Sequence, residues 1–287
     1  MMIDPLLSCI NEMAKDFFVN NRNRKGSTTT ESSKDYQPFI KVADISSLGR
    51  SHRVFGHKTK RTHHLLSDLE LAVFLLFEWQ SSTEDIQEQF PLDINITKQI
   101  ADDVGIKHPS QKGELKIMTT DFYVISKNIN SVTSQLALQA KYSNHLDDNR
   151  TIEKLELERR YWEQKDVDFK IITEKDIPRA VTDNIKWLYP SKNTYLITIE
   201  ENDFTFYSEQ IIESPTLKII DFCKKIDSSY DHPLGTALGK LKNLIAHGYI
   251  SFDIRKDYRK IVCAELSIVD KVYSNYIDRE LKHASNQ

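Results

Sequence analysis

Apolar side chains recur along this chain with two different periods, and the periods predict its helices and strands. Residues 67–80 are apolar nearly all round, which is typical of a helix buried on every side. Residues 115–125 and 135–142 instead alternate between apolar and polar positions, which predicts two strands. Residues 151–164 return to a helical pattern. This order of elements predicts an α/β catalytic core.

The same pattern divides the chain into three regions. Residues 1–36 predict an amphipathic helix over 1–20 and a flexible linker, residues 37–172 carry the α/β core, and residues 173–287 form a second domain. In the second domain, helices are expected at 178–188, 208–212, 216–226 and 234–247, with strands at 249–254 and 259–268. Helices followed by a short hairpin favour a winged-helix-like C-terminal domain.

Charged residues interrupt the apolar pattern at three positions. Glu70 is aligned with the apolar residues three, four and seven positions further along its helix, where a carboxylate is costly unless a cation accompanies it. Asp121 lies in the first strand, on the face that alternation assigns to Thr119 and Tyr123. Gln139 and Lys141 share one face of the second strand.

A carboxylate on a helix, a carboxylate in a strand and a polar-x-Lys tripeptide in the next strand resemble the layout of the PD-(D/E)xK nucleases. Two oxygen ligands would hold Mg²⁺, and the lysine would lie beside the water that attacks a phosphodiester. Each residue alone is more often a solvated, paired or turn residue. Their order and their apolar surroundings favour the nuclease interpretation.

Five ordered blocks are similar to the TnsA family, the endonuclease subunits of heteromeric cut-and-paste transposases: residues 61–70, 85–92, 107–109, 118–122 and 153–162. The resemblance implies a restriction-endonuclease-like mixed-sheet core, a winged-helix-like C-terminal domain and Mg²⁺-dependent cutting of the 5′ strands at transposon ends. The catalytic residues that it implies are Glu70, Asp121, Gln139 and Lys141.

The resemblance also implies a set of metal ligands. These are Glu70, Asp121 and the backbone carbonyl of Ala140, with Gln139 and Glu158 as further candidates. Mg²⁺ is the expected ion, and Mn²⁺ is expected to substitute for it. Many wider relatives carry Glu or Asp where Gln139 stands, but TnsA proteins resemble this chain in using Gln, so the change is not read as inactivating.

The charge of the chain argues against a strong, free-standing DNA binder, because the formal net charge is −3. The TnsA resemblance implies that the chain acts on double-stranded transposon ends. It also implies two protein partners that bring the chain to this DNA: a DDE-type transposase of the TnsB type, and an AAA+ ATPase of the TnsC type that docks on the C-terminal domain.

Cysteine usage indicates a reducing compartment. Cys9, Cys223 and Cys263 lie far apart and form no ligand pattern, so reduced thiols are expected. No apolar run approaches the roughly 20 residues of a membrane span. A bacterial cytoplasmic protein, associated with the nucleoid when active, is therefore expected.

A basic stretch without acidic residues precedes Glu70, from residue 45 to residue 67. It is either a phosphate-contacting segment or a solvated loop. The candidate DNA contacts in it are Arg50, Arg53, Lys58, Lys60 and Arg61. Zinc binding at His63 and His64 is disfavoured, because side chains of adjacent residues point apart.

Two other functions are compatible with the sequence. A stand-alone nuclease, either restriction-like or a junction resolvase, would share the core but cut naked DNA unaided. A non-enzymatic winged-helix adaptor would carry a decayed nuclease core. The presence of Glu70, Asp121 and Lys141 argues against decay.

Overall fold

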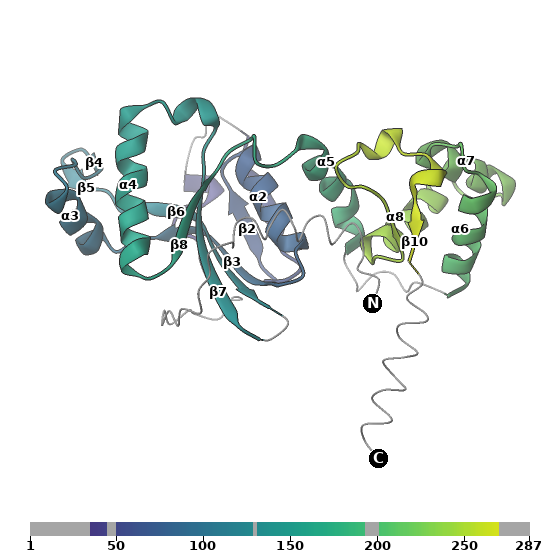
Figure 1. Cartoon of the computed structure of the whole chain (residues 1–287), viewed down its shortest axis with the longest axis horizontal. Coiled ribbons are helices and arrows are strands. Elements are labelled where there is room, and N and C mark those ends of the chain that lie inside the picture. Colours follow the sequence, from purple (N-terminus) through teal and green to yellow (C-terminus); the bar gives the residue numbers. More distant parts are fainter. Residues whose placement is uncertain (1–34, 45–49, 129–130, 193–200, 270–287) are drawn as a thin grey trace, which may run out of the picture. The chain divides into compact units, whose positions relative to one another are not determined.

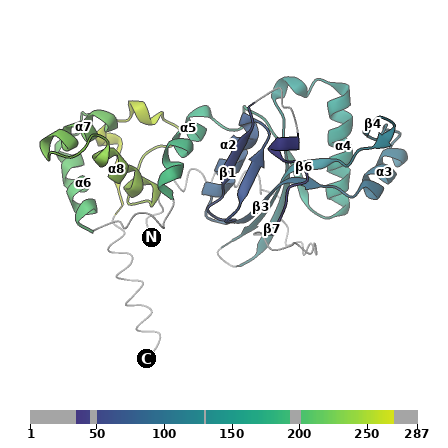
Figure 2. The same cartoon turned by 180° about the vertical axis from the view of Figure 1, so that it is seen from behind.

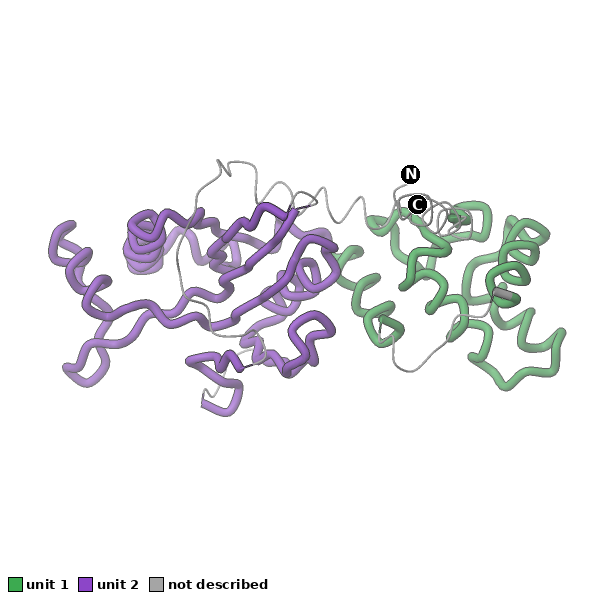
Figure 3. The backbone as a smooth tube through the Cα atoms, turned by 90° about the horizontal axis from the view of Figure 1, so that it is seen from below, with its two compact units in different colours: residues 1–10, 179–287 green, residues 11–178 purple. Residues whose placement is uncertain are grey.

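The structure is a computed structural model that describes residues 35–44, 50–128, 131–192 and 201–269. The helix expected over residues 1–20 and nearly all of the linker lie outside these residues. The chain forms two compact units that divide between Pro178 and Arg179, six residues beyond the expected boundary (Figure 3). Each unit is described by itself.

The N-terminal unit is built on a mixed four-stranded sheet with the strand order β3-β6-β7-β8. The first two pairs are antiparallel and the last pair is parallel. The strands are β3 (Thr83–Pro91), β6 (Thr119–Lys127), β7 (Thr133–Ala140) and β8 (Asp168–Ile172). The expected α/β class with a mixed-sheet core is confirmed, and it fits a restriction-endonuclease-like fold.

Helix α2 (Asp68–Trp79) lies on one face of this sheet, and every residue from Leu69 to Trp79 is buried (Figures 1 and 2). Ser67 is its N-cap, with a side-chain oxygen that accepts a hydrogen bond from the backbone N–H of Glu70. The apolar pattern therefore predicted both the helix and its central position. Glu70 enters the interior because it lies in the first turn of this helix.

Helix α4 (Asn149–Gln164) covers the opposite face and joins the parallel strands β7 and β8 (Figures 1 and 2). Leu157, Tyr161 and Trp162 pack with Tyr123 and Ala137 of the sheet. The rings of Tyr123 and Trp162 stack with centroids 5.2 Å apart. This packing fixes the rotation of α4 about its axis.

A separate hairpin, β1 (His52–Phe55) and β2 (Thr62–Leu65), precedes α2. Its turn begins at Gly56, where a Cβ atom would lie 2.4 Å from Thr59 Oγ1. Only glycine fits there without displacing the turn. The shorter elements of the unit are η1 (Val42–Asp44), α3 (Ile94–Asp103), β4 (Ser110–Gln111), β5 (Glu114–Leu115) and η2 (Ser143–His145).

The C-terminal unit is mainly helical. Its helices are α5 (Arg179–Leu188), η3 (Tyr189–Lys192), α6 (Glu201–Glu213), α7 (Ile219–Ser229) and α8 (Thr236–Ala246). Gly248 follows α8 with a φ of 73°, as expected for a helix C-terminus. The smaller elements are β9 (Ile250–Ser251), η4 (Tyr258–Lys260), η5 (Cys263–Glu265) and β10 (Ser267–Ile268).

The long strands expected at 249–254 and 259–268 are wrong, because β9 and β10 have only two residues each. The buried side chain of Asn184 on α5 explains the difference. Its amide donates to the carbonyls of Ile254 and Lys256, and its carbonyl accepts from the N–H of Tyr258. Trp187 stacks on Tyr258 with ring centroids 4.1 Å apart. The segment is thus bound to α5 and does not extend the hairpin.

Both described cysteines, Cys223 and Cys263, are buried and free. Burial raises the pKa of the Cys223 thiol to about 12 and that of Cys263 to about 11. Both are therefore inert core residues. Among the described residues, no helix is long and apolar enough to cross a membrane.

Candidate active site

The candidate site lies where the ladder between β6 and β7 stops. Backbone pairing ends at Phe122 and Leu138. Beyond that pair, side chains connect the strands: Gln139 Oε1 accepts from the N–H of Asp121 at 3.0 Å, and Asp121 Oδ2 accepts from the N–H of Ala140 at 2.9 Å. Asp121 is therefore fixed at the fork between two strands.

This fork changes which side chains share a face. Trp162 of α4 donates to Thr120 Oγ1 at 2.7 Å and also stacks on Tyr123, so both residues face α4. Strict alternation would place them on opposite faces, and the expectation that Thr119, Asp121 and Tyr123 share one face is wrong. Alternation fails where pairing with β7 ends and where pairing with β3 skips Asp121, opposite Gln89 with its φ of 49°.

Glu70 is held by the two residues that precede its helix, Leu66 and Ser67. Its Oε2 accepts from the N–H of Leu66 at 2.8 Å, and its Oε1 accepts from the Ser67 hydroxyl at 3.0 Å. Burial and the nearby charge of Asp121 raise the pKa of Glu70 to about 8. The carboxyl groups of Glu70 on the helix and Asp121 in the strand therefore lie close together, as expected.

Lys141 brings positive charge to this pair. It follows β7 directly and is anchored by its N–H, which donates to the carbonyl of Ile172 at 2.9 Å. Burial raises the pKa of Asp121, and the charge of Lys141 opposes that shift. The same positive charge opposes the raised pKa values of Glu70 and Glu158. The charge of Lys141 therefore acts on all three acidic groups.

Glu158 of α4 is the third buried carboxyl group. Its Oε1 accepts from the Thr120 hydroxyl at 2.6 Å, and Thr120 in turn accepts from the indole of Trp162. Burial raises the pKa of Glu158 well above its ordinary value, and the charge of Asp121 adds to that effect. The relay from Trp162 through Thr120 positions Glu158 next to the fork.

Gln89 of β3 belongs to the site and was not predicted. Its Nε2 donates to Glu70 Oε2 at 3.3 Å and to Asp121 Oδ1 at 3.2 Å, while its Oε1 accepts from the Thr119 hydroxyl at 3.2 Å. The signal for it is weak: β3 is rich in polar residues, yet most of them are buried. Buried polar residues in a strand require partners.

The basic residues between residues 45 and 67 differ in their burial and in their bonding partners. Arg61 is buried and paired with Glu88 through both terminal nitrogens, so its assignment as a DNA contact is wrong. Lys58 donates from its ammonium to the carbonyl of Thr83 at 2.8 Å, and burial lowers its pKa. Arg50, Arg53 and Lys60 are exposed.

The paired histidines have different partners. His63 is buried between Thr59 and Glu88, whereas His64 Nδ1 accepts from the N–H of Val42 at 3.2 Å. In the described part of the chain, no group of three His, Cys, Asp or Glu side chains could hold a metal ion. A cation at Glu70 and Asp121 would therefore need carbonyl or water oxygens to complete its ligand shell.

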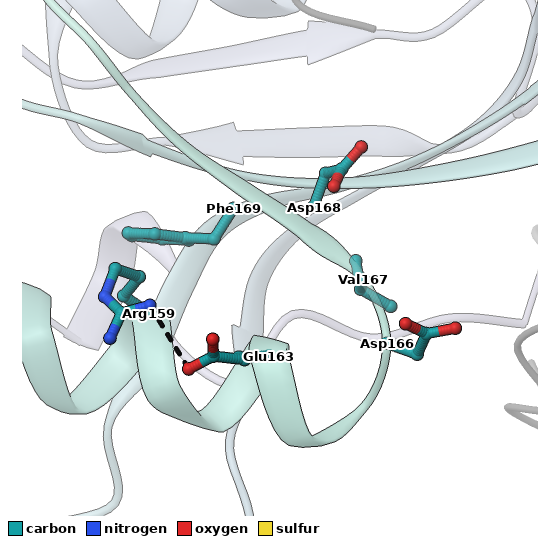
Figure 4. Close-up of a pocket in the computed structure, with 6 residues that line it drawn as sticks. All are labelled: Arg159, Glu163, Asp166, Val167, Asp168 and Phe169. Atoms are coloured by element: carbon teal, nitrogen blue, oxygen red, sulfur yellow. Dashed lines mark hydrogen bonds and ion pairs between the residues drawn. The ribbon is translucent and has the colours of Figure 1, made fainter. Parts of the chain in front are cut away.

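Two surface pockets of the N-terminal unit lie at different parts of α4. One, of about 730 Å³, has four basic residues in its wall, Lys107, Lys116, Arg150 and Lys154. The other, of about 270 Å³, is lined by Arg159, Glu163, Asp166, Val167, Asp168 and Phe169. Figure 4 shows that Arg159 in this second pocket is paired with Glu163. Only the first pocket has the charge to contact phosphate.

Sequence comparisons agree with this geometry. Residues 80–174 match the family model described as TnsA-like endonuclease N terminal, and residues 176–254 match the one described as TnsA endonuclease C terminal. The chain is 45% identical over 253 residues to the Transposon Tn7 transposition protein TnsA of Escherichia coli. That alignment covers 88% of this chain and 90% of the relative.

Proposed function

Because this chain belongs to the TnsA family of transposition endonucleases, we propose that its cluster of Glu70, Asp121 and Lys141 cuts the 5′ strand at each transposon end. One observation carries the assignment of the site. The carboxyl groups of Glu70 and Asp121 share the Gln89 amide at the fork between β6 and β7, and buried Glu158 is bonded to Thr120 beside them. The charge of Lys141 acts on all three groups. Such a cluster is suited to receiving a divalent cation.

The donor set fits Mg²⁺, with Mn²⁺ as a substitute. Glu70 and Asp121 offer carboxylate oxygens, and Ala140 is already in contact with Asp121 through its N–H, so its carbonyl is the third proposed ligand. When bound, the cation would neutralise charge at the scissile phosphate.

Lys141 and Gln139 have different proposed roles. The ammonium of Lys141 orients the attacking water and stabilises negative charge on the phosphate. Gln139 is a positioning residue, since its amide oxygen is bonded to the backbone N–H of Asp121. This role explains why an amide serves where other nucleases carry a carboxylate: only an acceptor is required.

Glu158 lies beyond this group of ligands. It is bonded to Thr120, which leaves its other carboxyl oxygen to contact the site through a water molecule. We propose that this water-mediated contact is its role in the site, where burial raises its pKa well above the ordinary value.

The basic pocket is the proposed track for the DNA backbone. Lys154 lies one helical turn, about 6 Å, before Glu158 on α4, so the pocket borders the side of the helix that leads to the site. Arg50, Arg53 and Lys60 remain candidate phosphate contacts. Replacing Lys154 and Lys116 with Ala should weaken DNA binding and flatten its salt dependence without changing metal affinity.

Delivery to DNA is proposed to depend on partners. A DDE-type transposase of the TnsB type would recognise the ends and cut the 3′ strands, and an AAA+ ATPase of the TnsC type would dock on the C-terminal unit. The net charge of −3 supports this dependence on partners, because the chain lacks the positive charge of a strong DNA binder. The winged-helix interpretation of that unit stays a proposal, and the turn between its two expected strands, at residues 255–258, is bound to α5 through Asn184.

A transposition assay tests the proposal when its products are resolved by long-read sequencing. With the partner proteins, the wild type should release the element fully and give simple insertions. Asp121→Ala should leave 3′ cutting and joining intact, so the element remains attached to donor DNA and cointegrates accumulate.

Simple insertions at wild-type frequency from Asp121→Ala would reject the assignment of the site. Specific double-strand cutting by the wild type alone would favour the stand-alone nuclease instead. Equal Mn²⁺ binding by wild type and Asp121→Ala, measured by calorimetry, would reject the proposed ligands.

A further inference from the structure

Gln89 makes a contact that a simple structural residue does not need to make. Its single amide nitrogen donates to both proposed metal ligands, at 3.3 Å to Glu70 Oε2 and 3.2 Å to Asp121 Oδ1. The Thr119 hydroxyl donates to the amide oxygen, so the nitrogen is the end that faces the carboxylates. Gln89 is 2% exposed, and its backbone has a φ of 49°, which is uncommon for a residue other than glycine.

The remaining carboxylate oxygens are occupied by other donors. Glu70 Oε1 accepts from Ser67, and Asp121 Oδ2 accepts from the N–H of Ala140. Glu70 Oε2 accepts from the N–H of Leu66 as well as from Gln89. Glu70 Oε2 and Asp121 Oδ1 are thus the two oxygens that share one donor, the amide nitrogen of Gln89. A Mg²⁺ ion bound to that pair would need about 2.1 Å to each oxygen. An N–H₂ group within hydrogen-bond distance of both would then point its hydrogens at a cation.

We propose that Gln89 is a placeholder for the cation: its amide holds the two carboxylates together in the metal-free protein and swings away when the metal binds. This inference rests on the proposed function. The amide supplies two donor hydrogens in place of a double positive charge, which keeps two buried acidic groups adjacent before the metal arrives. Gln89 is thus a positioning residue and not a ligand.

A thermodynamic cycle makes the proposal testable. If the amide stabilises only the metal-free form, Gln89→Ala must weaken that form and leave the metal-bound form unchanged. Mn²⁺ affinity must then rise by the same factor, about tenfold for one donor shared between two carboxylates. The measurements are calorimetric titration with Mn²⁺ and melting curves with and without Mn²⁺. Gln89→Met, which keeps the shape without the donor, should give the same increase if the alanine variant folds poorly.

A matched control lies two residues away on the same strand. Gln87 is also 2% exposed, and its amide donates to Asp85 and not to the site. Gln87→Ala should lower the melting temperature equally with and without Mn²⁺ and leave the affinity unchanged. Thr119→Val should change metal affinity in the same direction as Gln89→Ala but by less, because it only frees the orientation of the amide.

The outcomes separate this inference from the proposed function. Weaker Mn²⁺ binding by Gln89→Ala and Gln89→Met would make Gln89 a ligand and overturn the placeholder role. Unchanged affinity, with equal losses of melting temperature in both forms, would make it purely structural. A wild type that binds no Mn²⁺, or an Asp121→Ala variant that binds it equally well, would instead reject the proposed function.

Discussion

Two buried acidic clusters lie next to each other in the N-terminal unit, and they differ in how their charge is balanced. Glu88 and Gln89 are neighbours on β3, yet Glu88 belongs to one cluster and Gln89 to the other. At the first cluster a carboxylate meets a buried arginine. At the second, Glu70 and Asp121 meet each other and an amide.

In the cluster around Glu88, both carboxylate oxygens are bonded, and Arg61 Nε is the buried atom left without a partner among the described residues. The carboxylate accepts from Arg61 at 2.9 and 2.6 Å, from His63 Nδ1 at 2.8 Å and from the N–H of His64 at 3.0 Å. Burial alone would raise the pKa of Glu88, but hydrogen bonds and charge from His63 and Arg61 lower it to about 2. Burial lowers the pKa of His63, the hydrogen bond and charge of Glu88 oppose that shift, and Arg61 supplies a permanent compensating charge.

This contrast separates structural from functional acidity. Arg61 and Glu88 join the β1–β2 hairpin to the sheet, and because Arg61 balances the charge of Glu88, no ligand is needed there. Burial raises the pKa values of Glu70, Asp121 and Glu158, and the protein supplies too little positive charge to offset that effect. A buried charge without a partner is costly, and proteins keep it where it is used.

The largest expected effect concerns Lys141, the cation of the second cluster. Lys141→Ala should lower the rate of strand cleavage by about a thousandfold or more, because the developing charge on the phosphate loses its stabilising group. Lys141→Arg should restore little, since its planar fork has a different reach. Cleavage would be followed on end-labelled transposon DNA with partner proteins present. Mn²⁺ binding should persist in both variants, and cleavage at the wild-type rate by Lys141→Ala would contradict the role.

The next largest effect concerns stability, which should change in opposite ways when an acidic residue of each cluster is replaced. Glu88→Gln should cost about 3–5 kcal/mol in free energy of unfolding, because it leaves Arg61 buried without its counter-charge. Glu70→Gln in the metal-free protein should cost nothing or stabilise, since it removes a carboxyl group next to Asp121. Urea unfolding in the presence of a chelator would measure both. Equal destabilisation by the two substitutions would remove the distinction between the clusters.

The contribution of Glu88 to the free energy of unfolding should depend on pH within a defined range. The pKa of Glu88 is lowered from an ordinary 4.5 to about 2 in the folded protein. Its stabilising contribution is therefore present in full above pH 4.5 and is lost as the pH falls toward 2. The difference in unfolding free energy between wild type and Glu88→Gln should shrink across that window. A difference that stays constant from pH 6 to pH 3 would show that the charge of Glu88 is not what Arg61 requires.

The smallest effect is expected for an arginine–carboxylate group on the surface. Glu156 also has a pKa lowered to about 2, by hydrogen bonds from Arg159 and Arg160. Its side chain is 32% exposed, so water screens the interaction. Glu156→Gln should change stability by less than about 1 kcal/mol. A loss as large as that of Glu88→Gln would mean that burial is not what separates the two pairs.

Elements with their own strong pattern were predictable from the sequence. The helix expected at 67–80 is α2 (Asp68–Trp79), and the one expected at 151–164 is α4 (Asn149–Gln164). The convergence of Glu70, Asp121 and Lys141 followed from their order on a helix and two strands. In each case the signal lies within one segment or between neighbouring ones.

Contacts between distant segments were not predictable in the same way. Arg61 has the sequence signature of a surface residue, and its partner Glu88 is 27 residues away. Gln89 meets Glu70 and Asp121 across 19 and 32 residues. Asn184 shortens a hairpin that lies about 70 residues further on. Each depends on tertiary packing, which local periodicity does not encode.

The most direct test of the account is the position of a bound ion. Crystals of the protein soaked in Mn²⁺ should give an anomalous peak at the manganese edge between Glu70 and Asp121, with the Gln89 amide displaced from both carboxylates. Asp121→Ala crystals treated in the same way should give no peak there. A peak elsewhere in the wild type, or none between these carboxylates while Gln89 keeps both hydrogen bonds, would contradict the claim that this cluster is the metal centre of the endonuclease.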